Sequence, residues 1–225
     1  MNTPKYVLFD IDGTLVNMRR GFMPSLITRL MQQIGREEVV LNGSSYAGRT
    51  DRDIFTQLLQ DNDIDVAHYD GFRKQYVALL DEMLTSAHID RLEGTRDAIE
   101  LCIDAGHHVG LLTGNFREAA FIKLNRVQLD TYFTEGAFGG DEANRNRLPE
   151  QAFNGIRPKL PSLHPSDMII IGDTPRDIAC AKHFGCTSVA VATGSYTAAQ
   201  LARYQPDVVL ETLAKTPDWA ASIGL

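Results

Sequence analysis

Hydrophobic residues follow two different spacings along this chain. Four β-prone residues, Tyr6 to Phe9, stand before two acids and a glycine, which predicts a short buried strand that ends at Asp10. After Val16 the apolar residues recur every three or four positions, as an amphipathic helix requires. We therefore expect residues 17–90 to form a helical block without strands.

From residue 91 onward, short apolar runs alternate with helical spacing. The runs at 109–113, 168–171, 189–191 and 208–210 predict strands, residues 148–156 predict a helix, and 132–147 are expected to be mainly loop. Strands separated by helices predict βαβ units and a parallel sheet. The predicted fold class is α/β, with a Rossmann-like core formed by 1–16 and 91–225 and the helical block 17–90 inserted into it.

Three candidate site residues each follow a predicted strand. Asp10 ends the first strand, Thr113 ends the strand at 109–113, and Asp173 follows the run at 168–172. Open parallel sheets bind ligands in the crevice outside the carboxyl ends of their strands. We therefore expect these side chains to face one crevice.

Composition narrows the classes of function. The net charge of −7 and the absence of a Lys/Arg block argue against nucleic acid as the main ligand. No apolar run approaches the ~20 residues of a membrane span, and the N-terminal segment lacks the apolar core of a signal peptide. The three cysteines have no metal-type spacing. We expect a cytoplasmic protein with no membrane partner.

Two pairs of acids are the candidate metal ligands. Asp10 and Asp12 form one pair and Asp173 and Asp177 the other, and each like-charge pair at ~5 Å costs roughly 3 kcal/mol at an effective dielectric of about 20. Acids in such positions form turns, cap helices, share a proton or bind a cation. A calcium loop is excluded, because Leu15 stands where that loop requires glycine. The hard cation Mg²⁺ prefers oxygen ligands and is the expected cofactor.

The turn Thr113-Gly114-Asn115 is the candidate phosphate-binding element. A threonine hydroxyl and the backbone N–H groups after it can hold phosphate oxygens, although a threonine in such a turn can also be purely structural. A phosphate site also needs a fixed positive charge. Its candidates, each of which taken alone is typical of a surface residue, are Arg145, Arg147 and Lys159.

Three segments in order resemble the signature segments of the haloacid dehalogenase-like hydrolase superfamily. They are Asp10-Ile-Asp12-Gly-Thr14, the strand ending in Thr113-Gly114, and Gly172-Asp173-Thr-Pro-Arg-Asp177. The resemblance spans essentially the whole chain. The helical block is similar to the small helical cap of that superfamily, and the tail after Asp173 is similar to phosphoglycolate phosphatase-like members.

The resemblance implies a two-step phosphatase mechanism. Asp10 is then the nucleophile that forms an aspartyl-phosphate, and Asp12 protonates the leaving alcohol and afterwards activates water. Mg²⁺ is then held by the Asp10 carboxylate, the backbone carbonyl of Asp12 and Asp173, with support from Asp177. Thr113 binds the transferring phosphoryl group, with Gly114 and Asn115 beside it.

The third signature departs from the usual pattern. Most relatives have a lysine there, often followed by proline, whereas Lys159 is followed by Leu160. Arg145 stands at the start of the helix predicted at 148–156 and resembles the arginine of a subset of relatives. We place Arg145 first and keep Arg147 and Lys159 as alternatives, because the guanidinium fork grips phosphate oxygens well.

A further expectation concerns specificity. The segment Gly48-Arg49-Thr50-Asp51 resembles a substrate loop of phosphoglycolate phosphatase-like caps, so that Arg49 can reach an anionic leaving group. The alternative is helix capping by Thr50 or Asp51 beside a surface arginine. A cap of this kind closes over the site, excludes water and sets specificity.

We therefore expect a Mg²⁺-dependent phosphatase that acts on a small phosphorylated metabolite, with its oligomeric state left open. One alternative keeps the fold but changes the reaction to that of a phosphomutase or a dehalogenase; a dehalogenase does not need the acid at Asp12. The other alternative is a non-catalytic phospho-aspartate switch, as in receiver domains. Those domains lack a helical insert of roughly 75 residues.

Overall fold

The computed structural model describes residues 4–36, 40, 46–214 and 219–225. Its centre is a six-stranded sheet in the order β5-β4-β1-β6-β7-β8, and every pair of neighbours is parallel. The strands are β1 Tyr6–Phe9, β4 His108–Thr113, β5 Gly136–Phe138, β6 Met168–Gly172, β7 Thr187–Val191 and β8 Val208–Leu210. The predicted α/β fold class with a parallel core is confirmed.

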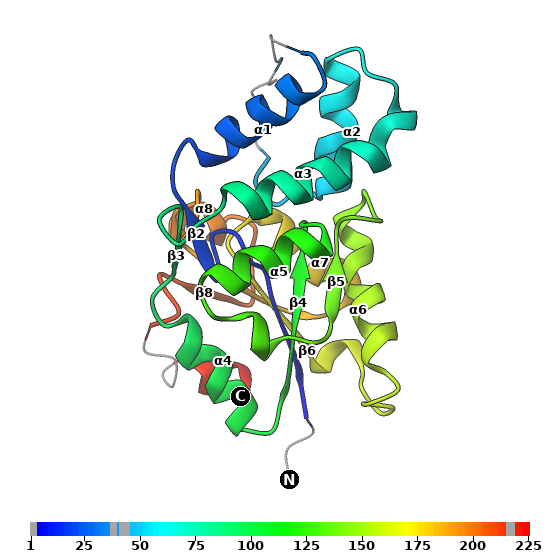
Figure 1. Ribbon diagram of the computed structural model, residues 1–225. Helices are drawn as coiled ribbons and strands as arrows, with labels where there is room; N and C mark the ends of the chain where they lie inside the picture. Colours follow the sequence, from blue (N-terminus) through cyan, green and yellow to red (C-terminus); the bar gives the residue numbers. More distant parts are fainter. Residues whose placement is uncertain (1–3, 37–39, 41–45, 215–218) are drawn as a thin grey trace.

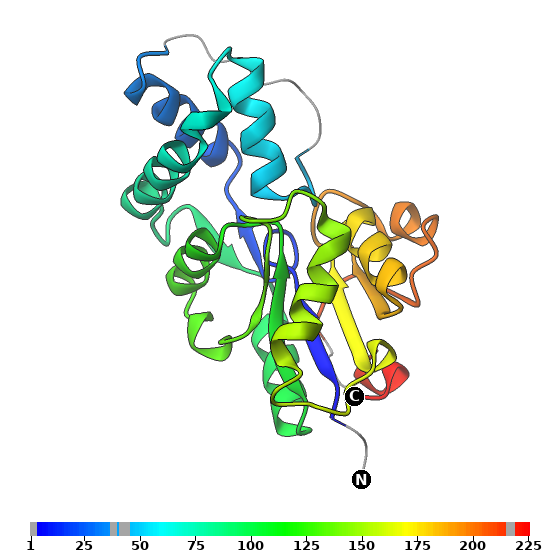
Figure 2. The same cartoon turned by 90° about the vertical axis from the view of Figure 1, so that its right-hand side faces the viewer.

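Helices cover both faces of the sheet (Figures 1 and 2). Val7 and Phe9 of β1 pack in one hydrophobic cluster with α4 (Thr95–Asp104) and α5 (Arg117–Arg126). Tyr6 and Leu8 pack in another with α6 (Leu148–Ile156) and α7 (Pro175–Phe184). Successive residues of a strand point to opposite faces, so a strand covered on both faces is continuously apolar. The short helix α8 (Ala198–Ala202) completes the core.

Three further helices lie over the carboxyl ends of the strands, as Figures 1 and 2 show. They are α1 Phe22–Gln33, α2 Asp51–Asp61 and α3 Tyr69–Met83. Phe55 and Tyr76 of these helices pack on Phe116 of the core, with ring centroids 5.3 and 5.8 Å away, and Phe72 packs on Phe55 at 5.6 Å. Among the described helices, none combines the length and apolarity that crossing a bilayer would take.

Two short strands that the sequence did not predict join this helical segment to the sheet. β2 (Val16–Met18) and β3 (Ile89–Arg91) form an antiparallel ribbon where the chain leaves the core and returns to it. The expectation of no strand near the ends of the helical block is therefore wrong. β5 likewise lies within a stretch expected to be mainly loop. Strands of three residues are too short for an apolar period, and their pairing depends on residues distant in sequence.

The N-terminal end of α2 is bonded directly to the core. The backbone N–H groups of Asp51 and Arg52 donate to the carbonyls of Gly114 and Gly139, at 2.6 and 3.0 Å. In return, the Asp51 carboxylate accepts from the backbone N–H of Phe116 at 2.7 Å. Thr50 caps the helix, as one of the sequence alternatives predicted, by accepting from Asp53 N–H. This helix therefore lies against the edge where the candidate residues gather.

Candidate active site

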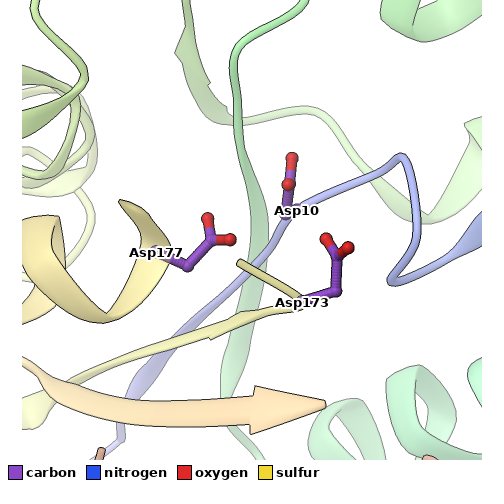
Figure 3. A group of neighbouring side chains, drawn as sticks. All are labelled: Asp10, Asp173 and Asp177. Atoms are coloured by element: carbon purple, nitrogen blue, oxygen red, sulfur yellow. The ribbon is translucent and has the colours of Figure 1, made fainter. Parts of the chain in front are cut away.

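The sheet order brings the predicted strand-end residues together. β1 lies between β4 and β6, so Asp10 at the end of β1 is flanked by Thr113 and Asp173. Figure 3 shows Asp173 and Asp177 extending toward Asp10. One oxygen from each of these three acids lies within 4.8 Å of the others. Asp10 and Asp173 line a pocket of about 520 Å³ that also reaches Thr113 and Asn115.

A tight turn places the Asp10 side chain at this edge. The backbone N–H of Asp10 donates to Ile171 at 2.9 Å, which continues the β1–β6 pairing for one more residue. The chain then reverses at Gly13, whose φ of 83° lies in the left-handed region that glycine readily adopts. The Thr193 hydroxyl donates to the Gly13 carbonyl at 2.5 Å, so the loop after β7 braces the turn.

Asp173 lies under glycines that approach it closely. A Cβ atom added to Gly194, or to Gly13, would overlap with the Asp173 carboxylate. Its Oδ1 atom is buried and is among the described side-chain atoms that have no hydrogen-bond partner. Burial, reinforced by the negative charges of Asp10 and Asp177, raises the pKa of Asp173 well above its usual value. A buried carboxylate oxygen without a donor, beside two further acids, is suited to a cation.

The Asp177 carboxylate is already occupied by donors. Thr174 donates to its Oδ2 through the backbone N–H at 3.0 Å, which is part of the N-terminal capping box of α7, and also through the hydroxyl at 2.6 Å. Arg145 donates to its Oδ1 at 2.5 Å. Asp177 therefore caps α7, as the helix-capping alternative predicted, and it also lies in the cluster with Asp10 and Asp173. Because both Asp177 oxygens already accept hydrogen bonds, this residue holds Arg145 and Thr174 in place beside the other two acids.

Of the three candidate cations, Arg145 alone lies among the acids. Its Nη2 atom is 3.2 Å from Asp10 and 2.5 Å from Asp177, and its side chain is 5% exposed. Arg147 is 68% exposed and pairs with Glu142, while Lys159 is 55% exposed and pairs with Glu135. Arg145 and Arg147 are the first and last residues of a short 3-10 helix before α6. Arg145 is buried on one side of it, and Arg147 faces solvent. Burial raises the pKa of Asp10 although Arg145 opposes that shift.

Asp12 lies apart from the acid cluster and has a partner that the sequence analysis missed. Lys123 Nζ, from α5, lies 2.9 and 2.7 Å from the two Asp12 carboxylate oxygens. Asn115 Nδ2 donates both to Asp12 at 2.8 Å and to the Thr113 hydroxyl at 2.8 Å. Lys123 follows the buried Ala119 by four residues, on the buried face of its helix. The position of Lys123 among the apolar residues of this helix face was the sequence feature that could have predicted its burial.

Arg49 and Gly114 lie where α2 meets the pocket. The Arg49 side chain is 9% exposed and pairs with Asp53 at 2.6 Å, so it is not the surface arginine of the alternative interpretation. Gly114 cannot carry a side chain, because a Cβ there would overlap with the Arg49 carbonyl. Asp51 also lines this pocket, and burial raises its pKa to about 6. The turn after β4 is thus pressed against α2.

Comparison with known proteins finds relatives that match nearly the whole chain. A curated relative, the pyrophosphatase PpaX of Anoxybacillus flavithermus, is 28% identical over 218 residues, which cover 92% of this chain and 93% of the relative. PpaX of Bacillus cereus is 25% identical over 214 residues, or 92% of each chain. The crystal structure of a predicted phosphoglycolate phosphatase from Haemophilus somnus superimposes with a TM-score of 0.71 at 19% identity, covering 98% of this chain and 99% of that one.

A family model extends the comparison to the signature segments themselves. The model described as haloacid dehalogenase-like hydrolase matches residues 7–191, which run from β1 through β7. The match includes the Asp10 turn, the Thr113 turn and the segment that holds Asp173 and Asp177. The predicted resemblance and the prediction of an enzyme are confirmed, and the chain belongs to the haloacid dehalogenase-like hydrolase family.

Proposed function

We propose that this protein is a Mg²⁺-dependent phosphatase that hydrolyses a small phosphorylated metabolite through an aspartyl-phosphate on Asp10. The observation that carries the proposal is the cluster of Asp10, Asp173 and Asp177 around one space, with the guanidinium of Arg145 against two of them. Phosphoryl transfer requires mainly positioning and stabilisation of charge. A nucleophilic carboxylate beside a cation and a metal site supplies both.

In the first step an Asp10 oxygen attacks phosphorus, and the bond from phosphorus to the leaving oxygen breaks. The departing alcohol or phosphate takes a proton from Asp12, whose side chain is 43% exposed toward the pocket. In the second step water attacks the phosphorus and gives its proton to Asp12, and the bond from phosphorus to Asp10 breaks. One carboxyl group thus serves as acid and then as base.

Mg²⁺ fits the residues at this position. The donor set is made of carboxylate oxygens, which Mg²⁺ prefers, and Asp173 Oδ1 is buried without a donor. We assign the ion to Asp10, Asp173 and the backbone carbonyl of Asp12, with Asp177 steadying the cluster through Arg145. When bound, the ion neutralises the charge of the acids and of the phosphoryl oxygens.

We further propose that residues 17–90, with α1, α2 and α3, act as a cap over the core of 1–16 and 91–225. The hydrogen bonds from α2 to Gly114 and Gly139 support a closed arrangement in which Arg49 borders the pocket. Closing such a segment over the site excludes water and sets the specificity for the leaving group. The Thr113 hydroxyl and the turn at Gly114 and Asn115 then surround the phosphoryl group.

Phosphate release tests the proposal directly. The assay presents p-nitrophenyl phosphate, phosphoglycolate and inorganic pyrophosphate, the last two suggested by the names of the similar proteins, with Mg²⁺ or with EDTA. We expect release of phosphate that requires Mg²⁺ and returns when Mg²⁺ is restored. A stable phospho-enzyme without turnover would instead favour the phospho-aspartate switch. If a sugar phosphate is added to the same set of substrates, its isomerisation without release of free phosphate would favour a phosphomutase.

Gly194→Ala is expected to weaken the response to Mg²⁺. The added Cβ would overlap with an Asp173 oxygen and displace the carboxylate, and disturbing the support of a metal ligand typically costs about 10–100-fold in affinity or activity. The measurements are the Mg²⁺ concentration for half-maximal phosphate release and the rise in melting temperature that Mg²⁺ produces.

A matched control for this substitution is Gly155→Ala. Gly155 lies within α6, where an added Cβ meets nothing within 4 Å and alanine favours the helix. Its Mg²⁺ response should equal that of the wild type. An unchanged half-maximal concentration in Gly194→Ala would argue against Asp173 as a ligand.

A further inference from the structure

Lys123 is a buried cation that the proposed mechanism does not yet use. Its side chain is 4% exposed, and its Nζ atom has three acceptors in reach: both Asp12 oxygens and Asn115 Oδ1 at 2.6 Å. An ammonium group carries three N–H donors and accepts none. Every donor therefore has a partner, and two of the three partners belong to one carboxylate.

The orientation of Asn115 follows from the same chemistry. Lys123 can only donate, so the Asn115 oxygen must face it, and the Asn115 amide nitrogen then faces the Asp12 side chain, to which it donates. The same nitrogen reaches the Thr113 hydroxyl at 2.8 Å. Lys123, Asn115 and Thr113 thus connect the end of β4 and α5 to the turn after β1.

Stability alone does not account for this lysine. Taking an ammonium group out of water is costly, and replacing a buried ion pair with apolar residues of similar volume is often neutral or stabilising. The other buried positions of α5, Ala119, Ala120 and Leu124, are apolar. What the ion pair does achieve is to restrict Asp12, which is open to the pocket on its other side.

We propose that Lys123 is a positioning residue that, with Asn115, fixes the Asp12 carboxylate for activation of water in the second step. The inference rests on the proposed function. In that step water attacks the phosphorus of the aspartyl-phosphate, its proton passes to Asp12, the bond from phosphorus to Asp10 breaks, and inorganic phosphate leaves. A base that swings out of place loses this step, and a misplacement of 1 Å can cost about 100-fold.

Lys123→Met tests the inference in the full-length protein. Methionine retains the length and packing of the side chain but cannot hold the carboxylate. We expect kcat for p-nitrophenyl phosphate to fall about 100-fold, because p-nitrophenolate leaves without a proton and hydrolysis of the aspartyl-phosphate then limits turnover. Rapid mixing should show a burst of p-nitrophenol equal to the enzyme concentration.

A double-mutant cycle separates positioning from a general structural effect. If Lys123 acts through Asp12, adding Lys123→Met to Asp12→Asn should cause little further loss. Lys74→Met, at an exposed position of α3, is the control lysine and should behave as the wild type. Should Lys123→Met not fold, Lys123→Gln replaces it with the same readouts.

Three results would contradict the positioning role of Lys123. An unchanged kcat, losses without a burst, or losses that add to those of Asp12→Asn would overturn the positioning role while leaving the phosphatase intact. Wild-type protein that releases no phosphate from any substrate would overturn the proposed function itself. The two failures are therefore distinguishable in one set of assays.

Discussion

Replacing Asp10 with asparagine is expected to lower phosphate release by at least about 10³-fold, equal to about 4 kcal/mol of transition-state stabilisation. The carboxamide matches the carboxylate in shape but offers no nucleophilic oxygen to phosphorus. Asp10 is 4% exposed and lies at the end of the central strand, so no neighbouring group can take its place without moving the backbone. Steady-state phosphate release with saturating Mg²⁺ measures the loss.

Folding controls decide whether that loss is chemical. Burial raises the pKa of Asp10 in the folded protein, so its ionisation at neutral pH costs stability, and the neutral asparagine removes that cost. Without Mg²⁺, the melting temperature of Asp10→Asn should therefore equal or exceed that of the wild type. Asp104→Asn, at an exposed position of α4, should keep full activity. Turnover by Asp10→Asn close to the wild-type rate would refute the nucleophile assignment.

Replacing Arg145 with methionine is expected to cause the largest loss of stability. The guanidinium is 5% exposed, contacts Asp10 and Asp177, and donates to the Gly48 carbonyl at 3.2 Å. Removing one partner of a buried ion pair leaves uncompensated charge and typically costs about 3–5 kcal/mol. For a chain of this size that corresponds to a fall of roughly 6–20 °C in melting temperature. Denaturant unfolding monitored by circular dichroism measures the loss in the free energy of unfolding, and a thermal scan measures the fall in melting temperature.

The neighbouring arginine supplies the control. Arg147 is 68% exposed and pairs with Glu142 at 3.8 Å, so Arg147→Met should change stability by no more than about 0.5 kcal/mol. Mg²⁺ should restore part of the stability of Arg145→Met, because the ion offsets the same acids. Equal stability of the two methionine variants would show that Arg145 does not balance the cluster.

The positions of the candidate acids were predictable from the sequence because their signals are local. Four apolar residues before Asp10 and the apolar run 168–171 before Asp173 mark strands, and the carboxyl ends of parallel strands meet at one edge of a sheet. The capping box at Asp177 is equally local, since it joins residues three positions apart. No knowledge of distant partners was needed for these predictions.

The choice of cation depended on distant contacts. Arg145 and Arg147 are two residues apart and equally basic in sequence, yet one is buried against Asp177, 32 residues away, and the other faces solvent. Lys123 reaches Asp12 across 111 residues of chain. The helical spacing of Lys123 indicates that it is buried, but the sequence does not indicate which distant carboxylate it pairs with.

The sequence by itself determined the α/β fold, the family, and the strand-end acids of the candidate site, because apolar spacing and short motifs act over a few residues. Only the tertiary structure decided that Arg145 lies among the acids, that Lys123 pairs with Asp12, and that three-residue strands join the helical segment to the core. Those features rest on pairing of charges and backbone groups that come together only when the chain is folded.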